Sequence, residues 1–163
     1  MSHLSSIQNK IYNLPDLKSL IKQWKSTKKK IVFTNGCFDI LHKGHIEVLA
    51  KTANLGNRLI IGLNSDDSVK LLKGKNRPIN NEDARALLLS AFSFIDAVIL
   101  FSEETPLNLI SEITPDILAK GGDYKINEIV GYEEVQKNGG EVITIPFTEG
   151  FSSTDIIEKI KNG

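Results

Sequence analysis

An apolar, β-branched run at residues 31–34 leads directly into the segment Asn-Gly-Cys-Phe-Asp-Ile-Leu-His-Lys-Gly-His at residues 35–45, and a helical apolar pattern follows. His42 and His45 are therefore expected where a strand gives way to a helix. Ligands of open α/β sheets bind beyond the carboxyl ends of the strands, and the unpaired N–H groups that begin a helix attract anions. Gly44 removes a side chain where a phosphate needs close approach. The segment predicts a phosphate site with two imidazole donors.

Strand-like and helical patterns alternate along the rest of the chain. Further strands are expected at residues 58–63, 96–101, 117–119 and 141–145. Alternation of this kind predicts an α/β fold with one five-stranded parallel sheet and helices on both faces. Because the carboxyl ends of parallel strands share one edge, the polar and glycine-rich segments that follow the strands should converge there.

Local signals predict where several helices begin and end. Asn81 should cap one helix, and Thr105 should cap another with Pro106 just inside it. A single helix is expected near residues 128–137, and a basic loop broken by glycine and proline is expected at residues 72–78.

The composition suits a single domain spanning residues 1–163, with residues 1–29 as a helical leader, because 40% of the residues are apolar. Zero net charge argues against general binding of nucleic acid. The single cysteine, Cys37, rules out an internal disulfide and fits a reducing compartment. No apolar run is long enough to span a membrane, and the first residues lack a signal-peptide pattern. The cytoplasm is the expected compartment.

The basic loop and the helix after it bring four cations close together. Lys73, Lys75 and Arg77 lie in the loop, and Arg85 lies on the next helix. Cations at such positions are usually solvated. The same cluster also suits the phosphates of two anionic substrates, which arginine binds bidentately and lysine as a point charge.

Other polar residues are expected at the same edge of the sheet. Ser152, Ser153 and Thr154 predict the N-cap of the last helix, and their amides and hydroxyls also suit a triphosphate. Asp39 and Asp123 are each either a local turn former or an acceptor for a substrate hydroxyl.

Two other interpretations of the histidine segment stay open. His42 and His45 suit an ordinary turn and helix start, bonded to nearby backbone. Together with Cys37 and Asp39 they also offer ligand types that suit zinc, although the spacing matches no recognised zinc pattern. The sequence has no P-loop, Gly-x-Gly-x-x-Gly fingerprint or Gly-x-Ser-x-Gly elbow. We therefore expect the histidines to stabilise charge rather than to activate a serine.

Residues 36–45 resemble the signature of the cytidylyltransferase-like nucleotidyltransferases. Further segments narrow the resemblance to the adenylyltransferase domain of the bacterial heptose-phosphate kinase/adenylyltransferases, and these segments are residues 62–66, 72–74, 77–78, 120–124 and 140–142. The most specific of them is Lys-Gly-Gly-Asp-Tyr at residues 120–124.

The resemblance implies a Rossmann-like, three-layer α/β/α fold with strand order 3-2-1-4-5. It also implies a Mg²⁺-dependent transfer of AMP from ATP to a sugar 1-phosphate, heptose 1-phosphate, with release of pyrophosphate. Mg²⁺ would bridge the triphosphate oxygens, so no dedicated metal ligands are expected in the protein. A homodimer is expected, as is a separate sugar kinase upstream, since no kinase domain is visible in the sequence.

The same resemblance implies roles for individual residues. His42 and His45 match the signature histidines, Lys73 matches the loop lysine, and these three are expected to be catalytic. The nucleotide is expected to contact Gly36, Phe38, Gly44, Asn64, Lys120, Gly121, Asp123, Ser152, Ser153 and Thr154. The sugar phosphate is expected to contact Asp39, Lys75, Arg77 and Arg85, the last of which matches the helix arginine of the family.

The sequence departs from the pattern in two places. Ile157 stands where the wider superfamily often has an arginine, so that phosphate contact is absent or supplied elsewhere. Lys75 resembles the paired lysines of glycerol-phosphate cytidylyltransferases, which leaves a CTP-dependent enzyme acting on a phospho-alcohol as an alternative. A non-catalytic nucleotide sensor is a third interpretation, against which the intact His42, His45 and Lys73 argue. The Met start and helical leader favour a natural single-domain chain.

Overall fold

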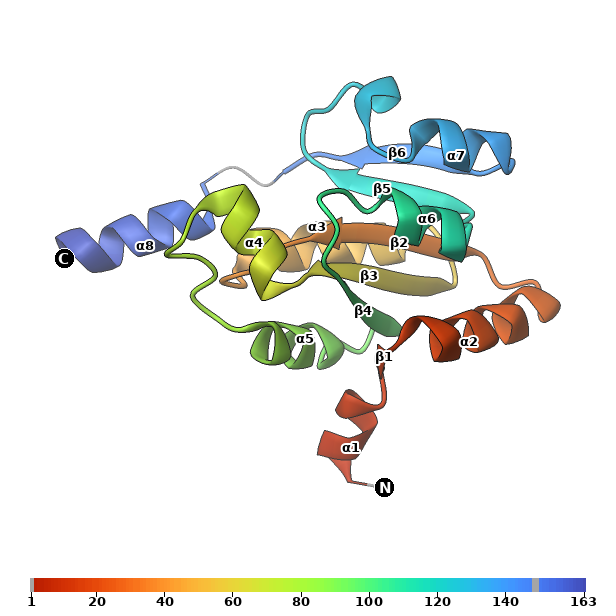
Figure 1. The fold of residues 1–163 in the computed structure, drawn as a ribbon, viewed down its shortest axis with the longest axis horizontal. Helices are drawn as coiled ribbons and strands as arrows, with labels where there is room; N and C mark the ends of the chain where they lie inside the picture. The colour runs from red at the N-terminus through yellow and green to blue at the C-terminus, as the bar shows by residue number, and fades with distance from the viewer. Residues whose placement is uncertain (1, 148–149) are drawn as a thin grey trace.

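The computed structural model describes residues 2–147 and 150–163. These residues form one parallel sheet of six strands in the order β1-β4-β3-β2-β5-β6 (Figure 1). The strands are β1 (Ile11–Tyr12), β2 (Ile31–Gly36), β3 (Arg58–Asn64), β4 (Ala97–Phe101), β5 (Ile117–Gly121) and β6 (Glu141–Ile145).

The predicted parallel sheet and its order are confirmed, with one strand added. The five expected strands are β2 to β6, and 3-2-1-4-5 corresponds to β4-β3-β2-β5-β6. The sixth strand, β1, lies at the edge, with Ile11 in register with Val98 of β4. Two residues carry no periodic signal, so the sequence did not predict this strand. Residues 1–29 thus contain a strand as well as α1 (His3–Gln8) and α2 (Leu14–Ser26).

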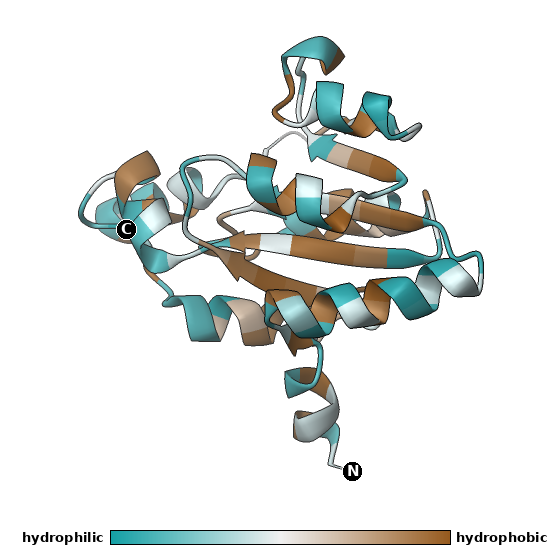
Figure 2. Ribbon diagram, turned by 45° about the vertical axis from the view of Figure 1, so that its right-hand side comes forward, coloured by the Kyte–Doolittle hydropathy of each residue, from teal (hydrophilic) through white to brown (hydrophobic). Residues whose placement is uncertain are grey.

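Helices cover both faces because successive side chains of a strand point to opposite faces. Ile31 and Phe33 of β2 pack in one core with α2, α6 and α7, whereas Val32 packs in the other with α3 and α5. Figure 2 shows the strands as the most hydrophobic elements, between helices that are hydrophilic on their outer sides. The covering helices are α3 (Lys43–Ala53), α5 (Glu82–Ser90), α6 (Leu107–Ile113) and α7 (Tyr132–Lys137).

The sheet opens between β2 and β5. β2 pairs with β3 along its whole length, but its register with β5 is confined to Val32 and Phe33, near the start of both strands. β5 in turn pairs with β6 along its whole length. Beyond Phe33 the two central strands therefore separate. The chain order of the strands reverses at this same place, which is the switch point where open α/β sheets bind ligands.

Several predicted boundaries need correction. Asn81 does cap α5, because its Oδ1 accepts a hydrogen bond from the Ala84 N–H at 2.9 Å. The predicted cap at Thr105 is wrong, since Pro106 occupies the N-cap position of α6. The basic loop is shorter than expected and starts at Gly74, because α4 (Asp66–Lys73) continues through Lys73.

The single helix predicted near residues 128–137 is two elements. A short 3₁₀ helix, η1 (Ile126–Glu128), precedes α7, and Gly131 lies between them with φ 92°. That left-handed conformation interrupts helical backbone and suits glycine. A Cβ at this position would lie 2.7 Å from Ile110 Cδ1, so the residue is restricted by packing as well.

The last helix, α8 (Ser153–Asn162), extends away from the sheet (Figure 1). None of its residues, all of which the structure describes, is buried. Its first turn is tied to the segment after β2, because Ser153 Oγ donates to the Ile40 carbonyl at 3.1 Å. Within residues 2–147 and 150–163, no helix is long and apolar enough to cross a membrane.

Candidate active site

A cavity of about 690 Å³ lies where β2 and β5 separate. The ends of these two strands line it, together with the first turns of α3 and α8 and the end of α4. The structure thus brings most of the predicted site residues together in its wall, namely Gly36, Phe38, Asp39, His42, Gly44, His45, Lys73, Lys120, Gly121, Ser152, Ser153 and Thr154.

The two histidines of the segment stack on each other. His42 is the N-cap residue of α3 and His45 lies in its first turn, so their rings meet with centroids 3.8 Å apart at an angle of 26°. The Nδ1 atoms of both rings are buried and have no hydrogen-bond partner among the described residues. Both residues line the cavity and are partly exposed, so the atoms of each ring other than the buried Nδ1 are the ones that a bound group can contact.

Both imidazoles are neutral at pH 7. Burial lowers the pKa of His42. Burial, followed by the charges of His42 and Lys73, lowers the pKa of His45 to about 4. A neutral imidazole keeps one N–H donor. An anion bound in the cavity would raise the pKa of these imidazoles, because its negative charge stabilises the protonated ring that burial disfavours.

Gly44 and Phe38 fix the positions of the rings. A Cβ on Gly44 would lie 3.2 Å from the His42 ring and 3.2 Å from Phe151 Cβ, so the glycine permits close packing at the start of α3. Phe38 has a left-handed φ of 45°, and its ring meets the His45 ring in a T-shaped contact, with centroids 5.4 Å apart and an interplanar angle of 64°. A Cβ on Gly36 would lie 3.0 Å from the Phe38 ring. For both glycines, the atoms nearest to an added Cβ belong to protein side chains.

Two lysines supply the positive charge of the cavity. Lys73 comes from the last turn of α4, and Lys120 comes from β5 on the other side of the opening. Burial lowers the pKa of the Lys120 ammonium, whose Nζ lies 6.0 Å from the Tyr124 ring centroid. A half-buried lysine regains stability when an anion binds beside it. The cavity therefore favours a ligand with several negative charges.

The first turn of α8 has the predicted cap. Ser152 Oγ accepts a hydrogen bond from the Asp155 N–H at 3.0 Å. The remaining N–H groups of that turn have the positive end of the helix dipole behind them. Since the first turn of α3 lies in the same wall, two helix starts meet at the cavity.

Arg85 does not have the predicted role of contacting the substrate. Its side chain is fully buried and lies outside the cavity wall. Its guanidinium donates to the carbonyls of Cys37, Asn64 and Asn80 and to the Asp66 carboxylate, at 2.7 to 2.9 Å. With its donors used in this way, Arg85 holds loops together and is unavailable to a ligand.

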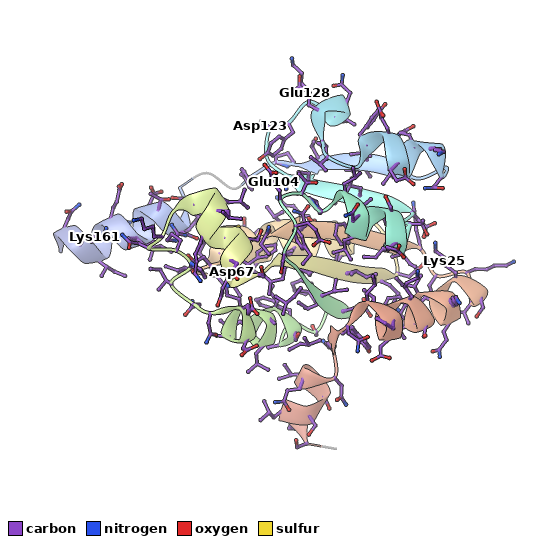
Figure 3. The ribbon with its side chains drawn as sticks, viewed as in Figure 1. Lys25, Asp67, Glu104, Asp123, Glu128 and Lys161 are labelled. Atoms are coloured by element: carbon purple, nitrogen blue, oxygen red, sulfur yellow. The ribbon has the colours of Figure 1, made fainter. Side chains whose placement is uncertain are left out.

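Asn64, Lys75 and Asp123 also lie outside the cavity wall that the described residues form. Asn64 is buried and its side-chain amide donates to Ser68 Oγ at 2.9 Å. Lys75 is exposed in the loop after α4. Asp123 is exposed in the loop that follows β5 (Figure 3). The structure therefore does not bring these three predicted residues together with the rest of the site.

Asp39 and Arg77 bind each other rather than standing free for a substrate. Asp39 Oδ2 accepts from Arg77 Nε, and Oδ1 accepts from the backbone N–H groups of Ile79 and Asn80. Burial opposes ionisation of Asp39, but the bonds from Arg77 and from these two amides together hold its pKa below the usual value. Asp39 touches the cavity wall as a carboxylate with internal partners.

The cavity also has an aromatic wall, which was not predicted from the sequence. Tyr124, Phe147 and Phe151 line the cavity with their rings. Phe147 and Phe151 are exposed apolar side chains between β6 and α8. Large apolar residues in a stretch whose other residues are mostly polar were the available signal. Flat aromatic faces beside cations suit a ligand with both a planar ring and phosphates.

The zinc interpretation finds no support in the geometry. Across the described part of the chain, no three histidine, cysteine, aspartate or glutamate side chains come together as a metal-binding group. Asp39 is held by Arg77, and burial raises the pKa of the Cys37 thiol, although the nearby lysines and Arg85 oppose this. A neutral thiol is a poor metal ligand.

The fold and the cavity together define a class. A parallel α/β sheet has a cationic, aromatic-walled cavity at its switch point, with two helix starts in the wall. Proteins built in this way bind nucleotides.

Comparison with known proteins then gives the family. The sequence matches the cytidylyltransferase-like family over residues 33–159. The chain belongs to this family of nucleotidyltransferases, which confirms the resemblance drawn from residues 36–45.

Close relatives are found among bifunctional bacterial proteins. The bifunctional protein HldE of Campylobacter concisus is 51% identical over 158 residues, which are 97% of this chain and 32% of that protein. HldE of Campylobacter jejuni is 54% identical over 157 residues, which are 96% of this chain and 32% of that protein. The chain thus spans about a third of the length of these curated relatives.

Two solved structures share the fold. A lipopolysaccharide core biosynthesis protein from Thermoplasma volcanium superimposes with a TM-score of 0.60 at 32% identity, over 74% of this chain and 97% of that one. Pantoate-beta-alanine ligase from Francisella tularensis superimposes with a TM-score of 0.57 at 15% identity, over 93% of this chain and 76% of that one. The second likeness concerns the fold alone.

Proposed function

We propose that the chain transfers the adenylyl group of ATP to heptose 1-phosphate, giving ADP-heptose and pyrophosphate. The observation that carries this proposal is the stacked pair of neutral histidines that lines, with Lys73 and Lys120, a cavity at the switch point of the sheet. The relatives named HldE, about half identical over nearly the whole chain, support the choice of substrates.

In the proposed reaction an oxygen of the sugar phosphate attacks the α-phosphorus of ATP, and the bond from that phosphorus to the bridging oxygen of pyrophosphate breaks. Both reactants are anions, so the protein must first offset their repulsion and align them. A phosphate nucleophile is already ionised and needs no base. His42 and His45 would donate hydrogen bonds to the charge that grows on the transferring phosphate.

The two lysines and the start of α8 would bind the phosphate groups of the two substrates. Lys73 and Lys120 would each neutralise phosphate charge from one side of the cavity. The free amides after Ser152 would receive the triphosphate tail. The aromatic wall would stack on the base or the sugar.

Mg²⁺ is part of the proposal, because it keeps several waters and binds nucleotides largely through their phosphates. The residues present fit that mode. The cavity wall offers Asp155 as an exposed carboxylate in the first turn of α8, beside the place proposed for the triphosphate. When bound, the ion would neutralise charge on the pyrophosphate that leaves.

A cytoplasmic homodimer is also proposed, as is a sugar kinase activity that acts upstream and makes the substrate. The homodimer draws support from α8, whose residues are all accessible in the single chain. The kinase is inferred from the substrate, since a sugar 1-phosphate has to be made by a phosphorylating enzyme.

A pyrophosphate-release assay of four nucleoside triphosphates against a panel of sugar and polyol phosphates tests the proposal. We expect ATP to exceed CTP at least about tenfold in kcat/KM with heptose 1-phosphate, because about 1.4 kcal/mol from one base-specific hydrogen bond gives that factor. A preference for CTP with glycerol phosphate would replace the heptose assignment. Binding without pyrophosphate release for every pair would indicate a sensor.

A further inference from the structure

The buried carboxylate of Asp39, in the cavity wall, joins the segment after β2 to the loop before α5. Oδ1 accepts from the N–H groups of Ile79 and Asn80 at 2.7 and 3.0 Å, and Oδ2 accepts from Arg77 Nε. The Asn80 side chain donates back to the Asp39 carbonyl at 2.8 Å. We call these four residues, Asp39, Arg77, Ile79 and Asn80, the Asp39 clamp.

The Asp39 clamp rests on a buried arginine. Arg85 Nε donates to the Asn80 carbonyl at 2.9 Å, and its Nη1 donates to the Cys37 carbonyl at 2.7 Å. The same guanidinium thus binds the segment after β2 and the segment before α5. These bonds fix the position of the loop at residues 74–81 against the turn that carries the histidines.

Lys73 depends on that loop for its position. It is the last residue of α4, and the loop begins at the next residue. In α4 the buried residues are Ser68 and Val69, in its first half, whereas Leu71 and Leu72, just before Lys73, are 82% and 54% exposed. Packing therefore holds the first half of α4, and the end that carries Lys73 is held through the loop that follows.

We propose that Asp39 and Arg77 are positioning residues, whose clamp holds the Lys73 ammonium at the histidine pair. The effect on catalysis that this role implies rests on the proposed function, whereas the contacts between the loops are independent of it. A carboxylate with three internal donors has little capacity left for a substrate hydroxyl. This role replaces the direct substrate contacts that the sequence suggested for both residues.

Hydrogen exchange of the free, full-length chain tests the clamp without any substrate. Arg77→Ala should raise the exchange rates of the Ile79 and Asn80 amides about tenfold or more, since the Asp39 bonds that protect them weaken. Asn80→Ala removes the bond to the Asp39 carbonyl and should act in the same direction with smaller size. Unchanged exchange in both variants would overturn the clamp.

The chain offers a matched control at the other edge of the sheet. Asp96 accepts from Arg58 Nη1 at 2.8 Å and from the Leu59 N–H at 2.9 Å, so it also joins an arginine to backbone. Asp96→Asn should lower stability while leaving exchange at residues 74–81 and kcat at wild-type values. If Asp96→Asn changed them as much as Arg77→Ala, the effect would be general loosening and the proposal would fail.

A double-mutant cycle with Lys73→Ala separates positioning from direct contact. If Arg77 acts through Lys73, Arg77→Ala should lower kcat roughly 10- to 100-fold and add almost nothing in the Lys73→Ala background. Additive losses would mean that Arg77 contacts the substrate itself, which would overturn the proposal.

Calorimetry can measure the ATP affinity of the same four proteins. This separates a failure of the proposed adenylyl transfer from a failure of the Asp39 clamp. A wild-type chain that binds ATP without turnover would refute the proposed function, whereas coupled losses of affinity in the cycle would still support the clamp. Independent losses of ATP affinity would refute the clamp whatever the turnover of the wild type.

Discussion

The side chains that matter most for the proposed chemistry are two imidazoles held without protein partners for Nδ1. Burial lowers the pKa of both stacked rings, so they are neutral at pH 7 and can donate to an incoming charge rather than carry one beforehand. Placing neutral donors where charge develops lowers the barrier without strengthening ground-state binding equally.

His42→Ala and His45→Ala should each lower kcat by about 10²–10³-fold, as loss of a charge-stabilising donor does. The dissociation constant for ATP should change less, because the ground state carries less charge at that point. Steady-state kinetics and calorimetry measure the two effects. His3→Ala, on the distant helix α1, is the control and should be silent. Near-normal kcat in both site variants would refute the role.

Stability should depend on pH through His45. Burial, with the charges of His42 and Lys73, lowers its folded pKa to about 4, from 6.5 in the unfolded chain. Between these values the unfolded chain binds more protons, so the free energy of unfolding rises with pH and is lost as the pH falls from 6.5 toward 4. The advantage of the wild type over His45→Gln should shrink over that range by on the order of 1 kcal/mol. Urea unfolding at several pH values measures it, and parallel curves would contradict it.

The sequence alone placed the histidines correctly because a strand, a glycine and a helix start fix their surroundings locally. It misplaced Arg85, because a sequence shows that a charge exists and not which carbonyls surround it. Asp39 was left ambiguous for the same reason, since its partners lie about forty residues away in the chain.

Among the helices and loops, the end of α4 brings Lys73, and not Lys75, into the cavity wall. Lys73→Ala should lower kcat/KM roughly 100-fold, since it removes a cation from the cavity wall. Lys75→Ala is the matched control two residues away, exposed but outside that wall, and should stay within about threefold of wild type. Equal, severe losses would favour the paired-lysine chemistry of glycerol-phosphate enzymes instead.

A separate prediction concerns Gly131, which lies at the break between η1 and α7. Gly131→Ala should destabilise the chain by about 1–3 kcal/mol, because φ is 92° and the new Cβ would lie 2.7 Å from Ile110 Cδ1. Gly139→Ala is the control, with φ 78° but no described heavy atom within 4 Å of the new Cβ, and it should cost less. Chemical unfolding compares them, and kcat should be unchanged in both. Equal losses would mean that strain alone matters.

The long strands were easier to predict than the short edge strand and the break before α7. The five long apolar strands were predicted correctly because buried parallel strands are continuous apolar runs, whereas their order was implied by the family resemblance and is also confirmed. β1 was missed because two residues joined to β4 by backbone bonds carry no pattern. The split at Gly131 was missed because φ cannot be read from a lone glycine in a polar stretch.

Taken as a whole, the chain is two half-sheets, and β2 and β5 join them through register at Val32 and Phe33. The residues beyond this junction, among them Asn35 on β2 and Lys120 on β5, face the cavity from opposite halves. Any ligand there bridges the two halves at the place where strand pairing has ended. Occupancy at about 100 times the dissociation constant would add about 2.7 kcal/mol to the unfolding free energy. A bound substrate thus takes the place of the pairing that β2 and β5 lack beyond Phe33. In the protein without substrate, we expect local unfolding to begin along this line.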